Sequence, residues 1–250
     1  MNAAAAAFVL APALALGSFL NVVVARVPAR RSILRPPSSC GSCSTEILWR
    51  DNIPVLSYVF LRGHCRHCDA RVSPLYPAVE LVTAALIVAC VAVFGPTAWA
   101  ALAAGFCAVL VALSVIDAQH RIVPNRIVVP AAVVALVAHI AIDPSLAWLA
   151  WSVIAAGGLF LAVLAYPKGL GMGDVKLALL LGAMLGSSVT VALMIGFFAA
   201  LIPSAVLFSR HGTSARKMGV PLVPFLALGA VVALFFGEPI LDAYLALVSA

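Results

Sequence analysis

Long apolar runs dominate this chain and leave little choice of fold. A helix needs about 20 mostly apolar residues to cross the hydrocarbon core of a bilayer. With 64% hydrophobic residues, 10% charged residues and a mean hydropathy of +1.16, the 250-residue chain lacks the polar surface of a soluble domain. We therefore predict an all-α polytopic membrane protein with about eight transmembrane helices, although seven or nine would also fit. The predicted segments are 3–25, 76–94, 97–116, 127–142, 146–166, 175–186, 188–208 and 220–236, of which the fourth, sixth and eighth are short.

The basic residues are confined to alternate connections between these segments. All 15 Lys and Arg residues fall within 26–75, 117–126, 167–176 and 209–219, and the opposite connections carry none. Because Lys and Arg in short loops favour the cytoplasm, we expect these four segments to be cytoplasmic and both termini to lie outside. The net charge of +6 then reflects membrane orientation and contact with lipid, and predicts no nucleic-acid partner. The first apolar run lacks a basic start and is long, so we expect an uncleaved span and not a signal peptide.

The one sizeable polar stretch, 26–75, carries two CxxC pairs. Cys40, Cys43, Cys65 and Cys68 form a CxxC–x21–CxxC pattern, which is close to the spacing of zinc ribbons. Two disulfides are the alternative, but thiols stay reduced in the cytoplasm. The pattern therefore favours a structural Zn²⁺ ion that stabilises a loop with few core residues. His64 and His67 are further possible ligands, although solvated loop residues are the simpler interpretation.

Acidic residues at predicted membrane edges are the next candidates. An ionised carboxylate inside a span is costly and is functional by default. Asp117 ends the third predicted span and Asp174 begins the sixth, so both are expected at the cytoplasmic face. Two carboxylates that share a proton can act as general base and general acid, as in aspartic proteases. Charge relay in a proton- or ion-coupled transporter, or salt bridges with Arg121 or Lys176, would use the same residues.

Alternating glycines precede the second aspartate. Gly169, Gly171 and Gly173 lead into Asp174 in the stretch "GLGMGDVKLALLLG". Glycine lets another backbone approach closely, so this spacing favours a protease, in which an extended substrate docks beside the acid. A flexible entry loop or a broken transporter helix is the alternative. Glu80 opens the second predicted span, where it either caps the helix or lines an active chamber; capping is preferred.

Five stretches, in order, resemble one family of membrane proteases. "GMGDVKLALLLG" is similar to the GxGD motif of intramembrane aspartyl proteases, and specifically of type IV prepilin peptidases. The other matching stretches are "GSFLNVVVARVP" (17–28), "DNIPVLSYVFLRGHCRHCDARVSPLYPAVEL" (51–81), "IDAQHRIVPN" (116–125) and "PFLALGA" (224–230). Together they cover nearly the whole chain.

The resemblance implies a bifunctional leader peptidase and N-methyltransferase of the bacterial inner membrane, with its active site facing the cytoplasm. Such enzymes cut the basic leader of type IV prepilins or type II secretion pseudopilins and methylate the new N-terminus with S-adenosylmethionine. Asp117 and Asp174 would be the catalytic acids, and the four cysteines would belong to the methylation half. Gly171, Gly173 and Glu80 are candidate substrate-binding residues. The implied division is a first helix (1–25), a tetracysteine loop (26–75) and a peptidase domain (76–250).

Three departures from the family pattern leave these acids and cysteines untouched. The first cysteine pair reads CGSC, without the Pro that is common after its first Cys. "VPLVPFLALG" lacks a frequent Phe-Gly pair, and Asn125 stands where an acid is frequent. The methylation half is less well supported, because the sequence contains no GxGxxG turn after a strand.

Overall fold

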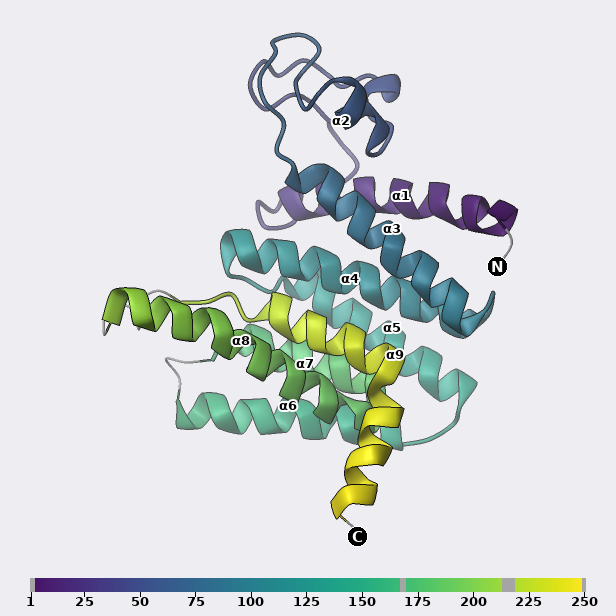
Figure 1. The fold of residues 1–250 in the computed structure, drawn as a ribbon, viewed down its shortest axis with the longest axis vertical. Helices are drawn as coiled ribbons and strands as arrows, with labels where there is room; N and C mark the ends of the chain where they lie inside the picture. The colour runs from purple at the N-terminus through teal and green to yellow at the C-terminus, as the bar shows by residue number, and fades with distance from the viewer. Residues whose placement is uncertain (1–2, 167–169, 213–218, 249–250) are drawn as a thin grey trace. The chain divides into compact units, whose positions relative to one another are not determined.

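The computed structural model describes residues 3–166, 170–212 and 219–248, and the regular elements of this part of the chain are helices (Figure 1). Four residues of the segments that the sequence analysis placed on the basic side lie outside the described residues: Lys168, Gly169, Arg216 and Lys217. Eight long helices are α1 (Ala3–Arg26), α3 (Leu75–Phe94), α4 (Ala98–His120), α5 (Asn125–Ile142), α6 (Ala147–Ala165), α7 (Met172–Leu185), α8 (Val189–His211) and α9 (Val223–Val248). Shorter elements are η1 (Trp49–Asp51), α2 (Leu56–Phe60) and η2 (Gly186–Ser188).

The predicted all-α membrane fold is confirmed. Seven segments of the described chain are long and apolar enough to cross a membrane. Eight long helices carry these seven segments, because α7 and α8, with η2 between them, lie within a single apolar segment of 39 residues, Met172–Arg210. With 14 residues, α7 is about 21 Å long, short of the roughly 30 Å of a hydrocarbon core.

A glycine turn separates α7 from α8. Gly186 has φ +56° and ψ −132°, a combination that only glycine adopts without strain. A Cβ atom there would also lie 2.9 Å from the ring of Trp148. The chain can therefore end α7 and begin α8 within three residues.

The chain divides into two compact units, Met1–Ala112 and Leu113–Ala250. In the first unit, α1 packs along α3, and a Cβ atom on Gly17 would lie 2.6 Å from the Cα atom of Glu80. The α1–α3 crossing therefore depends on a residue without a side chain. The three-part division at 25 and 75 stays a prediction.

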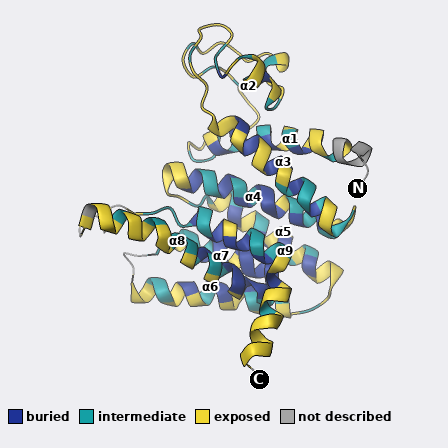
Figure 2. Ribbon diagram, viewed as in Figure 1, coloured by how far each residue is buried: buried dark blue, intermediate teal, exposed yellow. Residues whose placement is uncertain are grey.

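In the second unit, α7 is the most buried of the long helices. Nine of its 14 residues are buried (Figure 2), and it packs against α5, α6 and α9. Where α6 crosses it, a Cβ atom on Gly182 would lie 2.6 Å from backbone atoms of Trp151 and Ser152. The Ser152 hydroxyl donates a 2.6 Å hydrogen bond to the carbonyl of Leu179. This crossing agrees with the small-residue packing that holds helices together in lipid.

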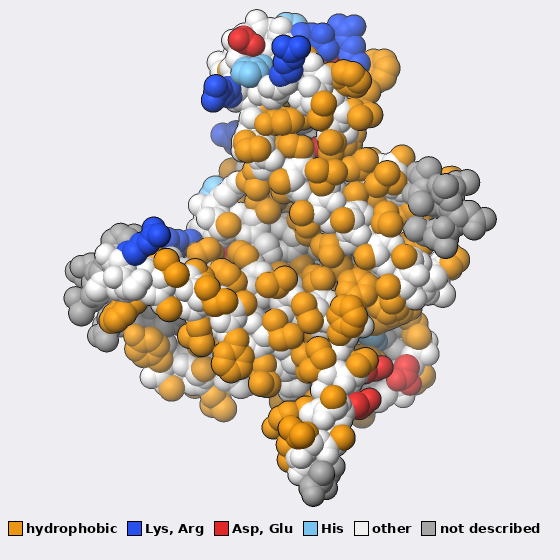
Figure 3. Space-filling view, viewed as in Figure 1, with side chains coloured by type: hydrophobic (Ala, Val, Ile, Leu, Met, Phe, Trp, Pro, Cys, Tyr) orange, Lys and Arg blue, Asp and Glu red, His pale blue; other side chains and the backbone are white. Residues whose placement is uncertain are grey.

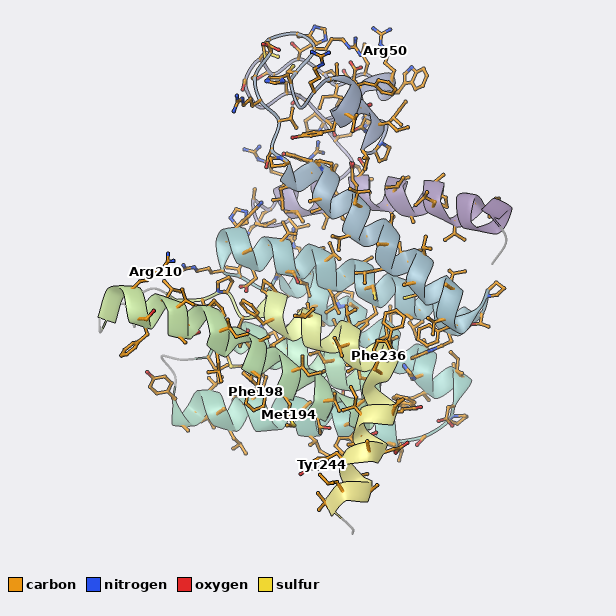
Figure 4. The ribbon with its side chains drawn as sticks, viewed as in Figure 1. Arg50, Met194, Phe198, Arg210, Phe236 and Tyr244 are labelled. Atoms are coloured by element: carbon orange, nitrogen blue, oxygen red, sulfur yellow. The ribbon has the colours of Figure 1, made fainter. Side chains whose placement is uncertain are left out.

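The surfaces of the helices are apolar, as a bilayer requires. Hydrophobic side chains cover much of the visible helical surface, and Lys and Arg side chains gather on the cysteine loop (Figure 3). Phe198 on α8 and Phe236 on α9 are 64% and 60% exposed, and both lie on outer helix surfaces (Figure 4). Arg210 lies near the end of α8, away from these apolar residues (Figure 4).

The last helix is longer than the sequence suggested. The predicted end at residue 236 is wrong, since α9 continues to Val248 through Glu238, Pro239 and Asp242. A proline inside a helix removes one backbone hydrogen bond and bends the axis, and α9 changes direction in its second half (Figure 1). The two acids interrupt the apolar pattern of the sequence, but the helix continues through them.

We predict that Gly182→Ala destabilises the protein by about 1–3 kcal/mol, because the added methyl group forces α6 and α7 apart. Thermal unfolding in detergent measures the effect. Gly157→Ala on α6 is the matched control, since a Cβ atom at Gly157 meets nothing within 4 Å. Equal melting temperatures for the two variants would contradict this account of the crossing.

Candidate active site and cysteine cluster

Asp117 lies in the last turn of α4 and is buried, with 7% of its surface exposed. Its Oδ2 atom accepts a 3.1 Å hydrogen bond from the backbone N–H of Val223, the first residue of α9. The first N–H groups of a helix have no partner within that helix, and they favour negative charge. The start of α9 therefore satisfies a carboxylate that the end of α4 alone would disfavour.

Asp174 is half-buried in the first turn of α7. Its Oδ2 atom accepts a 3.0 Å hydrogen bond from the backbone N–H of Gly171, the residue that precedes α7. A carboxylate at this position caps a helix and is stabilised by the helix dipole. Both aspartates are thus held through one oxygen by a backbone N–H at a helix start.

The two aspartates line one cavity of about 440 Å³. This volume falls within the usual range of ligand-binding pockets. The structure thus brings together the two acids that the sequence analysis selected, and it adds neighbours from the α4–α5 connection. The lining residues are Asp117, Arg121, Ile122, Val123, Asn125, Gly171, Gly173, Asp174 and Lys176.

Two contacts join the α4–α5 connection and the first residue of α5 to the start of α7. A Cβ atom on Gly173 would lie 2.9 Å from Cγ2 of Val123, so Gly173 allows this close approach. The Lys176 ammonium donates a 2.8 Å hydrogen bond to Oδ1 of Asn125. A Cβ atom on Gly171 would have 3.6 Å to its nearest neighbour. Of the two candidate glycines that the structure describes, Gly173 is needed for packing and Gly171 has room around it.

The salt-bridge interpretation of the aspartates finds no support in the described residues. The ion pair that the structure records joins Arg66 to Asp51, and Lys176 contacts Asn125 instead of Asp174. Sequence reasoning missed the Val223 amide, because a backbone donor leaves no side-chain signal. It also missed the Lys176–Asn125 bond, whose residues are 51 positions apart.

The four predicted metal ligands form a cluster in the loop before α3. The Sγ atoms of Cys40, Cys43, Cys65 and Cys68 all lie within 4.8 Å of one another. All six cysteines are free thiols, so the disulfide alternative is not realised in this structure. The cluster could hold a metal ion.

The cluster is built from two turns with the same backbone hydrogen bonds, 25 residues apart. In the first turn, Cys40 N bonds to Thr45 O and Ser44 N to Cys40 O; in the second, Cys65 N bonds to Ala70 O and Asp69 N to Cys65 O. Ser44 and Asp69 share a positive φ, +58° and +55°. The Ser39–Glu46 and His64–Arg71 bridges flank the two turns equivalently. Each CxxC pair thus sits in its own turn, and the two turns place four sulfur atoms around one point.

Comparison with known proteins decides the family. Residues 12–94 match the bacterial peptidase A24 N-terminal domain, and residues 104–208 match the type IV leader peptidase family. The prepilin leader peptidase/N-methyltransferase of Bacillus subtilis (strain 168) is 36% identical over 93% of this chain and 94% of its own length. The proteins of that name from Burkholderia pseudomallei (strain 1026b) and Pseudomonas aeruginosa are 35% and 31% identical over 93% of this chain, and over 86% and 90% of their own lengths. The chain belongs to the prepilin leader peptidase/N-methyltransferase family. No solved structure matches it.

In the second unit, the sequence blocks that resemble this family meet at the cavity. Ile116–Asn125 supplies Asp117 and the cavity wall, and the GxGD block supplies Asp174. Val223, which directly precedes the "PFLALGA" block, donates its N–H to Asp117. Blocks that lie over 100 residues apart therefore converge on one pair of carboxylates.

In the first unit, the other family blocks hold the loop against the helices. The Asn21 amide of α1 donates to the carbonyl of Tyr76 over 3.1 Å, and Gly17 packs on Glu80. Oε2 of Glu80 accepts a 2.7 Å hydrogen bond from the N–H of Val55, which has an unfavourable positive φ of +60°. The capping interpretation of Glu80 is wrong, because α3 begins at Leu75 and its first turn contains no acid. Glu80 instead fixes the loop, and its role in substrate binding stays a prediction.

The thiols of the cluster differ in acidity. Backbone hydrogen bonds from Cys43 and Ser42 lower the pKa of the Cys40 thiol to about 6. At Cys68, a backbone hydrogen bond from Ala70 lowers the pKa, but burial and the other three thiols outweigh it and raise the pKa to about 12. Four thiolates cannot lie this close together without a cation between them.

Cys68→Ser should sharply reduce the metal content of the purified protein, because one of four thiolate ligands is lost. Elemental analysis after dialysis measures it. Cys90→Ser is the matched control, since Cys90 is a buried thiol that lies outside the cluster. Wild-type protein without bound metal, or equal metal content in both variants, would contradict a metal site.

Proposed function

We propose that this chain cleaves the basic leader peptide of type IV prepilins or type II secretion pseudopilins, with Asp117 and Asp174 as the catalytic pair. One observation carries the proposal: the two carboxylates line one cavity, and a backbone N–H at a helix start holds each. The relatives reported above are named for this activity. In a transporter, by contrast, the cysteine cluster would have no evident role.

The pair would act through water, with no covalent intermediate. One carboxylate is ionised and takes a proton from a water molecule as the water oxygen attacks the scissile carbonyl carbon. The other is protonated and donates its proton to the carbonyl oxygen. Collapse of the resulting diol breaks the C–N bond, and a proton passes to the leaving amine. Val223 and Gly171 each bind Oδ2, which leaves the second oxygen of each carboxylate for water and substrate.

We infer that the cavity faces the cytoplasm. The cysteine loop and the α4–α5 connection carry basic residues, and Arg210 lies in the last turn of α8. Positive residues in short loops favour that side. A prepilin would then place its leader junction at the membrane boundary and its apolar helix among the membrane spans.

The four cysteines fit a structural Zn²⁺ ion. Thiolates are ligands that zinc prefers, and structural sites use four of them in a closed tetrahedron. Cys40, Cys43, Cys65 and Cys68 would hold the ion and so stabilise a loop that has few core residues. The ion has no part in peptide cleavage in this proposal.

The second activity is methylation of the new N-terminus with S-adenosylmethionine as donor. The names of the relatives support it. The elements described here include no strand followed by a glycine-rich turn and helix of the dinucleotide-binding kind. None of the described residues is therefore assigned to the methyl donor.

Asp117→Asn and Asp174→Asn should each abolish leader cleavage, because the pair loses its base or its acid. The assay incubates full-length purified enzyme with a prepilin that carries a basic leader and a Gly–Phe junction, and mass spectrometry detects the product. Asp242→Asn, at the far end of α9, should cleave normally. Near-normal cleavage by either active-site variant would refute the assignment.

Methylation should need S-adenosylmethionine, whereas cleavage should not. The same mass spectra separate the two reactions, since a methylated product is heavier than the cleaved one by a single methyl group. Cys68→Ser should lose the methyl gain and retain cleavage. Cleavage lost together with methylation, in a variant that remains folded, would show that the loop serves both reactions.

A further inference from the structure

Lys176 brings a positive charge into the cavity that holds the two aspartates. It lies two residues beyond Asp174 on α7 and is half-buried. A lysine side chain is flexible, and near a membrane edge it extends toward water unless it is held. The 2.8 Å hydrogen bond to Asn125 Oδ1 holds this ammonium at the cavity wall.

Asn125 orients the ammonium without neutralising it. An amide oxygen accepts a hydrogen bond and carries no net charge. The charged groups that line the cavity are therefore the two aspartates, the exposed Arg121 and Lys176. A cation that lines the same cavity as a carboxylate pair favours the ionised form of that pair.

The helices packed against α7 add few further charges near this cavity. Helix α6 has no charged side chain, and the acids of α9 lie in its second half. Helix α8 also packs on α7, and its Arg210 does not line the cavity. On α5, Arg126 is exposed and does not line the cavity, and His139 lies near the opposite end of the helix. Lys176 is thus the half-buried cation of the cavity, as far as the described residues show.

We propose that Lys176, held by Asn125, is a positioning residue that sets the pH range in which the aspartate pair works. The inference rests on the peptidase function proposed above. The cation favours the ionised carboxylate that acts as base, so the enzyme stays active at lower pH than an isolated pair would allow.

A competing account is mechanical. The Lys176–Asn125 bond joins α7 to the start of α5, and the Gly173–Val123 contact joins it to the preceding connection. The bond could therefore act only as a clamp. The two accounts differ for Asn125→Asp. An aspartate keeps the hydrogen bond to Lys176, which satisfies a clamp, but it cancels the positive charge.

The experiment measures kcat/KM for leader cleavage against pH, with full-length protein in detergent and the prepilin substrate described above. We expect Lys176→Met and Asn125→Asp to shift the acid limb of the profile upward by on the order of 1 pH unit. Lys176→Arg should keep the wild-type profile, because it keeps the charge. Arg126→Met removes the same charge one residue from Asn125 but outside the cavity, and should leave the profile in place.

The outcomes separate the accounts. A wild-type profile for Asn125→Asp, together with reduced cleavage by Lys176→Met, supports the clamp and overturns this inference. A Lys176→Met variant with the wild-type pH profile also overturns it. If thermal unfolding shows that Lys176→Met does not fold, Asn125→Asp carries the test. A folded wild-type enzyme that cleaves no prepilin overturns the proposed function and this inference with it, whereas wild-type cleavage with unshifted variants overturns this inference alone.

Discussion

Close approach of helix backbones is the interaction on which the rest of this structure depends. In a bilayer, lipid tails solvate apolar side chains as well as a protein interior does, so hydrophobic burial alone does not drive helices together. The α1–α3 and α6–α7 crossings instead place a glycine against the backbone of the partner helix. In the second unit, the α6–α7 crossing leaves little freedom for the ends of these two helices. The carboxylates and their backbone donors can therefore be held at fixed positions by elements that are far apart in sequence.

The proposed catalytic pair follows from the same constraint. A buried carboxylate must find hydrogen-bond donors in a place where water is scarce. In this chain the donors are the unpaired N–H groups at the starts of α7 and α9, which every helix has. Asp174 uses the start of its own helix, whereas Asp117 uses the start of a helix more than 100 residues later. Charge is thus tolerated at the membrane edge because helix starts, and not salt bridges, satisfy it.

Much of the fold could be predicted from the sequence, because apolar runs and basic loops report directly on membrane crossing. The helices and the cysteine cluster follow from spacing and residue type. The basic loops place Asp117 and Asp174 at the same face, and the resemblance to the family predicts that they act as a pair. Other features could not be predicted. The extension of α9 through Glu238 and Asp242 depends on helix continuity, which acids and a proline conceal. The Val223 donor, the Glu80–Val55 bond and the Lys176–Asn125 bond depend on which distant segments meet, and a single sequence does not encode that in any local pattern.

The cysteine loop solves a different physical problem from the membrane helices. Few of its residues are buried, yet two equivalent turns bring four sulfur atoms to one point. The bidentate pair of Arg66 and Asp51, with a shortest distance of 2.6 Å, joins the second turn to η1 and lowers the pKa of Asp51 through the hydrogen bonds from Arg66. Glu80 then ties the loop to α3 by one short bond to Val55. Order in the loop therefore depends on a few polar contacts and on its thiols. Reactions that need the loop should accordingly be more sensitive to metal loss than reactions that need only the helices of the second unit.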